Sequence, residues 1–265
     1  KYWINVIPKK FSNKIKFINF KKNIEQKNNL SPIFVMGLPR SGTTLVESLI
    51  SSNKKKIDNY GETFIIPNII KKILENNSDE LLLDISLIKS KVCKEYLKIS
   101  YNREMKSTLF VDKTLENIFF IDIIKEIFPL SKIIVCERDY FDNFVAIFQQ
   151  CLQGLSWAHK KSSILQYIQN FDNFVKKIKK QKNKNIHFVN LIELTENPIL
   201  ISKKILEFCD LDWDESVLKF YERNDLTIKT ASNVQIRKKI SKYEKNKFKE
   251  YQNPLKEYFH KINSI

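Results

Sequence analysis

Short apolar runs alternate along the chain with longer stretches in which apolar residues recur at helical spacing. Runs of strand length occur at 33–36, 110–113, 132–136 and 186–191. Helical spacing is found over 45–50, 68–107, 115–128, 143–152, 163–180 and 198–209. Strands that alternate with helices are typical of an α/β fold with a parallel sheet. We saw no internal repeat.

The first of these strands leads into a turn with two glycines and then into a helix. In such a strand–loop–helix unit, backbone N–H groups and the helix N-terminus bind phosphate. The turn reads G-x-x-x-x-G-T-T, which is a Walker A loop except that Thr43 replaces the lysine. The loop has a cation at another position, Arg40, which follows Pro39. We therefore predict a P-loop-type three-layer fold, with a central parallel sheet flanked by helices, and not ordinary ATP or GTP chemistry.

Three cations follow the ends of three predicted strands: Arg40, Lys113 and Arg138. In an open parallel sheet, ligands bind beyond the carboxyl ends of the strands. These cations are therefore expected to converge on one polyanion site. Glu62, in Gly61-Glu62, comes shortly before an apolar segment. One interpretation of Glu62 is a carboxylate that favours a helix start through the macrodipole.

The segment Pro39-Arg40-Ser41-Gly42-Thr43-Thr44 resembles the 5′-phosphosulfate loop of the sulfotransferases, P-[RK]-S-G-T-T. The likeness is to the tyrosylprotein-sulfotransferase-like group and to bacterial sulfotransferases often fused to tetratricopeptide repeats. The resemblance implies an enzyme that moves a sulfuryl group from PAPS, 3′-phosphoadenosine-5′-phosphosulfate, to a hydroxyl or amine. It also implies that the 37–44 loop holds the phosphosulfate and that no metal is required.

The resemblance extends to other positions. Gly61-Glu62 and the later Pro67 resemble the G-E-x-x-x-x-P element that carries the family's catalytic glutamate. Lys113 resembles a lysine near the transferred group, and Arg138 the arginine that grips the 3′-phosphate. The resemblance therefore implies that Glu62 is the general base.

Near the C-terminus, 229–237 resembles a segment that closes over the cofactor. Ser232 and Arg237 would return a hydroxyl and a cation to it. Three positions depart from the family pattern: Ala146 replaces a serine, Leu191 replaces a tyrosine and Phe64 replaces an arginine. The last departure argues against an acidic-peptide tyrosine substrate of the tyrosylprotein kind.

The 265 residues are expected to form one large domain over 32–265, with 1–31 as an arm or the end of an upstream region. The formal charge of +16 is explained by a solvated lysine surface or by attraction of a polyanion. No nucleic-acid module is recognised, so we expect no nucleic-acid partner. No apolar run approaches membrane-spanning length.

The four cysteines have no C-x-x-C spacing and the three histidines no ligand-like spacing, so we predict no metal site. His159 is the second candidate for the base. Two other functions remain as alternatives: a P-loop kinase or NTPase, and a non-catalytic protein that binds anions or nucleic acid. The acceptor stays open, since a glycan, a peptide, a lipid or a small metabolite could present the hydroxyl.

Overall fold

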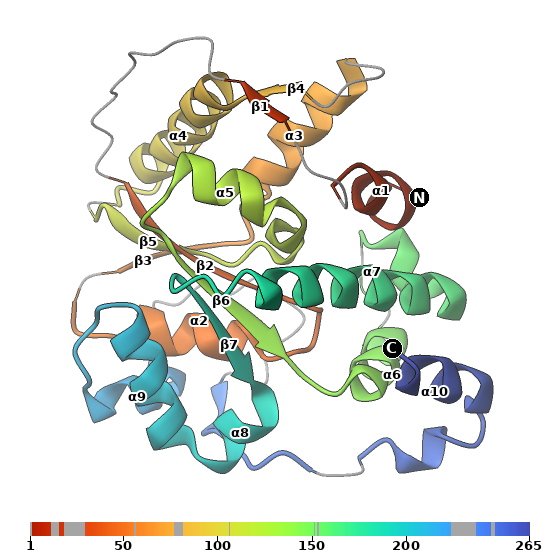
Figure 1. Cartoon of the computed structure of the whole chain (residues 1–265). Coiled ribbons are helices and arrows are strands. Elements are labelled where there is room, and N and C mark those ends of the chain that lie inside the picture. Colours follow the sequence, from red (N-terminus) through yellow and green to blue (C-terminus); the bar gives the residue numbers. More distant parts are fainter. Residues whose placement is uncertain are drawn as a thin grey trace.

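A five-stranded sheet forms the centre of the computed structural model, which describes residues 2–11, 16–18, 30–55, 57–76, 82–105, 107–150, 152, 154–223, 237–244 and 247–265 (Figure 1). The strand order is β3-β5-β2-β6-β7, and each neighbouring pair is parallel. The strands are β2 Ser31–Gly37, β3 Asp58–Gly61, β5 Leu109–Asp112, β6 Lys132–Glu137 and β7 Ile186–Asn190. A separate parallel pair joins β1 Lys16–Ile18 to β4 Leu82–Asp84.

Helices cover both faces of the sheet, which confirms the predicted three-layer α/β fold (Figure 1). The helical elements are η1 Tyr2–Val6, α1 Ile7–Phe11, α2 Thr43–Ser51, α3 Ile65–Asn76, α4 Ile85–Asn102, η2 Leu115–Phe120, α5 Ile121–Ile127, α6 Tyr140–Gln150, η3 Ser156–His159, α7 Lys161–Lys180, α8 Leu191–Glu196, α9 Pro198–Phe208, η4 Glu215–Glu222, η6 Lys249–Tyr251 and α10 Lys256–Asn263. None of these described helices has the length and apolar content that a bilayer-crossing helix requires.

Successive side chains of the buried strands point to opposite faces of the sheet, where they belong to two separate apolar clusters. In β2, Ile33 and Val35 pack with α2 and α9, whereas Phe34 and Met36 pack in the larger cluster on the opposite face. Because both faces of each central strand are buried, the strands read in the sequence as continuous apolar runs. This is why the runs at 33–36 and 132–136 predicted their strands well.

The edge strand β3 was not indicated by the sequence pattern. Its four residues, Asp58-Asn59-Tyr60-Gly61, include a single large apolar side chain, that of Tyr60. The strand is held by parallel pairing with β5, and its register shifts between Asn59 and Gly61. This strand therefore forms because it pairs with β5, and not because its residues have a high β-propensity.

Part of the region before Ser31 packs against the helical layer. Ile7 and Phe11 are buried, and the Phe11 ring lies edge-on to Phe120 with ring centroids 5.0 Å apart. These N-terminal residues contribute to the larger apolar cluster.

Asp112, the last residue of β5, ties the β3–α3 connection to the sheet. Its Oδ2 accepts hydrogen bonds from the Thr63 hydroxyl and the Tyr96 hydroxyl, both at 2.6 Å. Its Oδ1 accepts from the Thr114 backbone N–H at 2.9 Å. Burial raises the pKa of Asp112, and hydrogen bonds from Thr63, Tyr96 and Thr114 oppose that rise. This network fixes the strand ends beside which the candidate catalytic residues lie.

We expect Tyr96→Phe to lower the free energy of unfolding by about 1–3 kcal/mol, because a buried carboxylate loses one of its donors. Urea unfolding at pH 7 measures the change. Tyr101→Phe is the control, since Tyr101 lies on the same helix α4 and is 86% exposed. Equal stability of the two variants would contradict the structural role given to the Asp112 network.

Candidate active site

The loop between β2 and α2 forms a closed turn that ends in a helix N-terminus. The Ser41 hydroxyl and backbone N–H both donate to the Leu38 carbonyl, at 2.7 and 3.2 Å. Arg40 and Gly42 have positive φ values of 69° and 93°. Gly42 is the N-cap of α2, and no side chain caps this helix end. The backbone N–H groups and the helix dipole are therefore suited to an anion.

Close contacts explain the two glycines of the loop. A Cβ on Gly37 would lie 2.6 Å from the Cys136 carbonyl oxygen. A Cβ on Gly42 would lie 2.7 Å from Cδ1 of Leu191, the first residue of α8. On the other side, the Asn143 side-chain amide of α6 donates to the Pro39 carbonyl at 2.7 Å. The loop therefore packs against β6, α6 and α8.

Arg138, the first residue after β6, contacts the loop directly. Its Nη1 donates to the Arg40 carbonyl at 3.0 Å, and its Nη2 donates to the Tyr243 hydroxyl at 2.8 Å. The Tyr243 hydroxyl also contacts the Asp142 carboxylate, which lies 3.8 Å from Nη2 of Arg138. Burial lowers the pKa of Arg138, as it does for Arg40, where the Arg138 charge adds to the effect. A bound anion would offset this cost.

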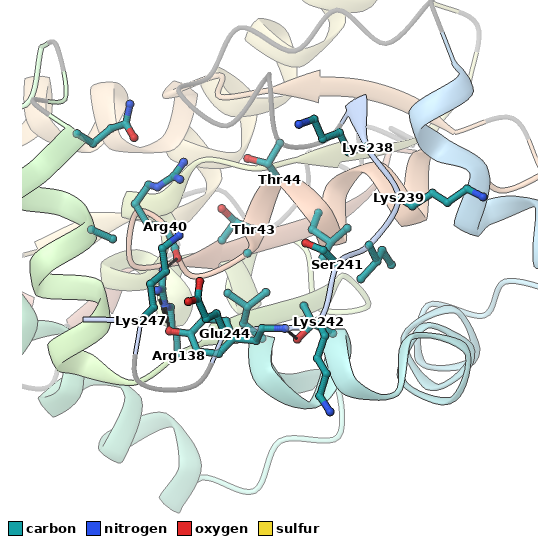
Figure 2. Close-up of a pocket in the computed structure, with 18 of the residues that line it drawn as sticks. Arg40, Thr43, Thr44, Arg138, Lys238, Lys239, Ser241, Lys242, Glu244 and Lys247 are labelled. Atoms are coloured by element: carbon teal, nitrogen blue, oxygen red, sulfur yellow. Dashed lines mark hydrogen bonds between the residues drawn. The ribbon is translucent and has the colours of Figure 1, made fainter. Parts of the chain in front are cut away.

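A cavity of about 770 Å³ opens over the loop (Figure 2). The predicted residues Arg40, Gly42, Thr43, Thr44 and Arg138 all line it. The charged side chains that line it, among the described residues, are Arg40, Arg138, Lys238, Lys239, Lys242, Lys247 and Glu244. This excess of positive charge suits a ligand with several negative charges.

The remaining predicted residues fall outside this cavity or outside the described structure. Ser232 and most of the segment 229–237 lie outside the described residues. Arg237 is exposed, and it is not among the described lining residues, although Lys238 and Lys239 beside it are. Nε2 of His159 lies 3.1 Å from the Leu152 carbonyl oxygen. His159 does not line the described cavity.

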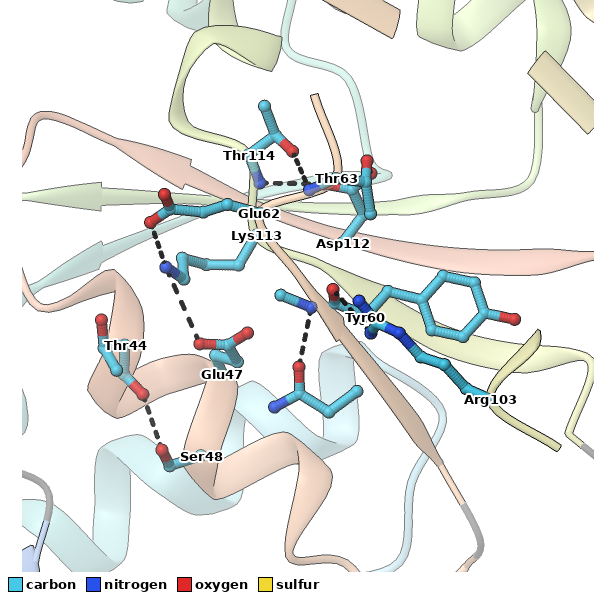
Figure 3. A network of polar contacts seen from close by, with 12 residues as sticks. Thr44, Glu47, Ser48, Tyr60, Glu62, Thr63, Arg103, Asp112, Lys113 and Thr114 are labelled. Atoms are coloured by element: carbon cyan, nitrogen blue, oxygen red, sulfur yellow. Dashed lines mark hydrogen bonds and ion pairs between the residues drawn. The ribbon is translucent and has the colours of Figure 1, made fainter. Parts of the chain in front are cut away.

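Lys113 and Glu62 form an ion pair at the carboxyl ends of β5 and β3 (Figure 3). The Lys113 Nζ donates to Oε1 of Glu62 at 2.5 Å. The Lys113 backbone N–H also donates to the Gly61 carbonyl at 2.9 Å, which aligns the two strand ends. The Lys113 side chain is 1% exposed and that of Glu62 is 31% exposed. A buried ammonium thus contacts a carboxylate that a molecule arriving from solvent can reach.

The sequence did not indicate two residues of the site: Glu47, which lies near Lys113, and Tyr243, which contacts Arg138. Glu47 is buried on α2, and its Oε2 lies 4.0 Å from the Lys113 Nζ (Figure 3). Its signal in the sequence is a charge inside an apolar helical run, four residues after Thr43 and so on the same helix face. Tyr243 lies in a basic C-terminal stretch whose pattern predicted no contact with Arg138.

Three comparisons, two of the sequence and one of the structure, show which known proteins this chain resembles. The sequence profile of the sulfotransferase family matches residues 32–215, which confirms the resemblance indicated by the loop. A protein of Aquifex aeolicus (strain VF5), itself uncharacterized, is 30% identical over 239 residues. These cover 84% of this chain but 31% of that protein, so the chain spans about a third of the length of this relative.

Solved structures also share the fold. The sulfotransferase domain of the Synechococcus PCC 7002 olefin synthase superposes with a TM-score of 0.64 at 16% identity, covering 93% of this chain and 98% of that domain. The sulfotransferase domain from the curacin biosynthetic pathway has a TM-score of 0.60 at 19% identity, covering 89% of this chain and 96% of that domain. At these identities the likeness concerns the fold.

We expect Gly42→Ala to be more destabilising than Gly154→Ala. Both glycines have positive φ, which costs an alanine about 1–2 kcal/mol, but among the described residues no atom outside the chain neighbours lies within 4 Å of a Cβ on Gly154. Leu191→Ala in the Gly42→Ala background should recover the extra loss, because it removes the crowded side chain. Urea unfolding of the wild type and of these three variants measures the losses. An equal loss at the two glycines would rule out the Leu191 contact.

Proposed function

The chain belongs to the sulfotransferase family, and from this premise we propose that it transfers the sulfuryl group of PAPS to a hydroxyl or amine acceptor. The observation that carries the proposal is the Lys113–Glu62 ion pair, which stands at the sheet edge beside the helix of the phosphate-binding loop. A cation for the transferred group and a carboxylate for the acceptor's proton are thereby adjacent to an anion-binding helix terminus.

The donor is assigned to the cavity over the loop. Its 5′-phosphosulfate fits the α2 N-terminus, with Thr43 and Thr44 in the first turn. Its 3′-phosphate is assigned to Arg138, which would exchange its contact with the Tyr243 hydroxyl for phosphate oxygens. The described residues contain no cluster of three or more side chains that could hold a metal ion. Arginine, lysine and backbone N–H groups supply the charge stabilisation in this proposal.

Each chemical step has a residue assigned to it. Glu62 takes the proton of the acceptor hydroxyl as that oxygen forms a bond to sulfur. The bond between sulfur and the phosphate oxygen breaks, and the oxygen leaves with the electron pair as part of adenosine 3′,5′-bisphosphate. Lys113 donates hydrogen bonds to the sulfuryl and leaving oxygens, where negative charge develops. The products are the sulfated acceptor and the bisphosphate.

The acceptor is a hydroxyl-bearing glycan, peptide or metabolite, or an amine. It approaches from solvent, because the Glu62 side chain is 31% exposed and Lys113 behind it is buried. Screening these acceptor classes with PAPS labelled in the sulfuryl group identifies the class. Incubation without an acceptor measures the background transfer to water.

We expect Arg40→Ala and Arg138→Ala each to weaken binding of adenosine 3′,5′-bisphosphate by about 10- to 100-fold. Each removes charge-assisted hydrogen bonds worth about 1.5–3 kcal/mol. Calorimetry without added metal measures the affinity. Arg103→Ala is the control, because Arg103 is exposed, donates to the Tyr60 carbonyl and is not among the described residues that line the cavity. Wild-type affinity in both loop variants would end the assignment of the donor site.

We expect Glu62→Gln to lower kcat by about 10²–10⁴-fold while the affinity for the bisphosphate and the melting temperature stay close to wild type. Glutamine keeps the size and a hydrogen-bond acceptor for Lys113 but is not a base at neutral pH. The turnover, the affinity and the melting temperature are all measured on one preparation. A folded variant with near-native kcat would exclude Glu62 as the base, and His159→Gln would be tested next.

A further inference from the structure

A second carboxylate faces Lys113 from the side opposite Glu62. Glu47 lies on α2, one turn beyond the phosphate-binding loop, and is buried. Its Oε2 is 4.0 Å from the Lys113 Nζ and has no hydrogen-bond partner among the described residues. Lys113 therefore lies between two carboxylates, in contact with the exposed one and just beyond contact with the buried one (Figure 3).

Packing does not explain a carboxylate at this position. The neighbouring α2 residues Val46, Leu49 and Ile50 belong to the apolar cluster beneath the sheet. A buried charge is costly unless it is paired, and apolar residues often replace buried ion pairs without loss of stability. A group that costs stability at the edge of a reaction site points to a role in the reaction.

The ionisation of Glu47 depends on everything packed around it. Burial raises its pKa from 4.5 to about 7. The Lys113 ammonium and a hydrogen bond from Asn59 oppose the rise, whereas the charges of Glu62 and Asp112 add to it. Glu47 thus changes its charge near neutral pH.

We propose that Glu47 is a positioning residue that holds the Lys113 ammonium while Glu62 takes up the acceptor's proton. The inference rests on the proposed function. Once Glu62 is neutral, it no longer compensates the buried ammonium, and Lys113 needs another anion. Ionised Glu47 supplies that charge from the opposite side. It keeps Lys113 directed at the leaving oxygen and prevents the ammonium from following the protonated Glu62 toward solvent.

The test compares kcat of the wild type with that of Glu47→Gln across pH. With a pKa of about 7, Glu47 is about 10% ionised at pH 6 and about 90% ionised at pH 8. If the ionised form turns over about tenfold faster, the ratio of wild type to variant is about twofold at pH 6 and about ninefold at pH 8. A merely structural role would lower kcat by the same factor at both pH values.

Glu116→Gln is the matched control. Glu116 is also buried, and burial likewise raises its pKa to about 7. The charges of Glu62 and Lys113 act on it as well, but the described residues show no ion pair between Glu116 and Lys113. The ratio of wild type to Glu116→Gln should therefore change less with pH than the ratio for Glu47→Gln. Glu47→Asp, which keeps the charge on a shorter side chain, should restore part of the pH dependence. Melting temperatures of all variants establish that each is folded.

Turnover is measured as release of adenosine 3′,5′-bisphosphate from PAPS, with the best acceptor of the screen and with water alone. A pH-independent ratio for Glu47→Gln, or the same ratio for Glu116→Gln, would overturn the inference while leaving the proposed function intact. Absence of transfer by the wild type to every acceptor and to water would overturn the proposed function itself. The two failures are therefore distinguishable.

Discussion

Parallel pairing of β5 with both β2 and β3 is the constraint on which the rest of the site depends. It brings the loop between β2 and α2, Lys113 after β5 and Glu62 after β3 to one edge of the sheet. Asp112 then locks this edge, because its carboxylate accepts hydrogen bonds from Thr63 beyond Glu62 and from Thr114 beyond Lys113. The residues proposed for catalysis are thus positioned by strand ends and not by long loops, which favours a pre-organised site.

Electrostatics divides the site into two parts that face the same loop. In the cavity over the loop, the charge of Arg138 adds to burial in lowering the pKa of Arg40, and Asp142 with Tyr243 compensates the charge of Arg138. At the strand ends, the buried cation Lys113 lies between Glu62 and Glu47. The first part favours a polyanion, and the second offers one positive charge and a proton acceptor. This division agrees with a donor that carries several charges and an acceptor that loses one proton.

Departures from the family pattern have local physical consequences. Leu191, in place of a tyrosine, packs against Gly42 and fills the space where a Cβ would otherwise fit. Ala146, in place of a serine, lines the cavity over the loop and has no hydroxyl. A tyrosine hydroxyl nevertheless reaches Arg138, but it comes from Tyr243 in the C-terminal stretch. A polar contact near Arg138 is therefore provided by a segment about 100 residues away in the sequence.

The sequence by itself determined the layered α/β fold, the loop after β2 and the three cations at strand ends. These features are local, because a strand buried on both faces is a continuous apolar run and a glycine turn before a helix is written in consecutive residues. Only the tertiary structure decided β3, the proximity of Glu47 to Lys113 and the contact of Tyr243 with Arg138. A polar edge strand is stabilised by its neighbour and has little propensity of its own. A buried carboxylate acquires its partner and its raised pKa only when segments distant in the chain meet.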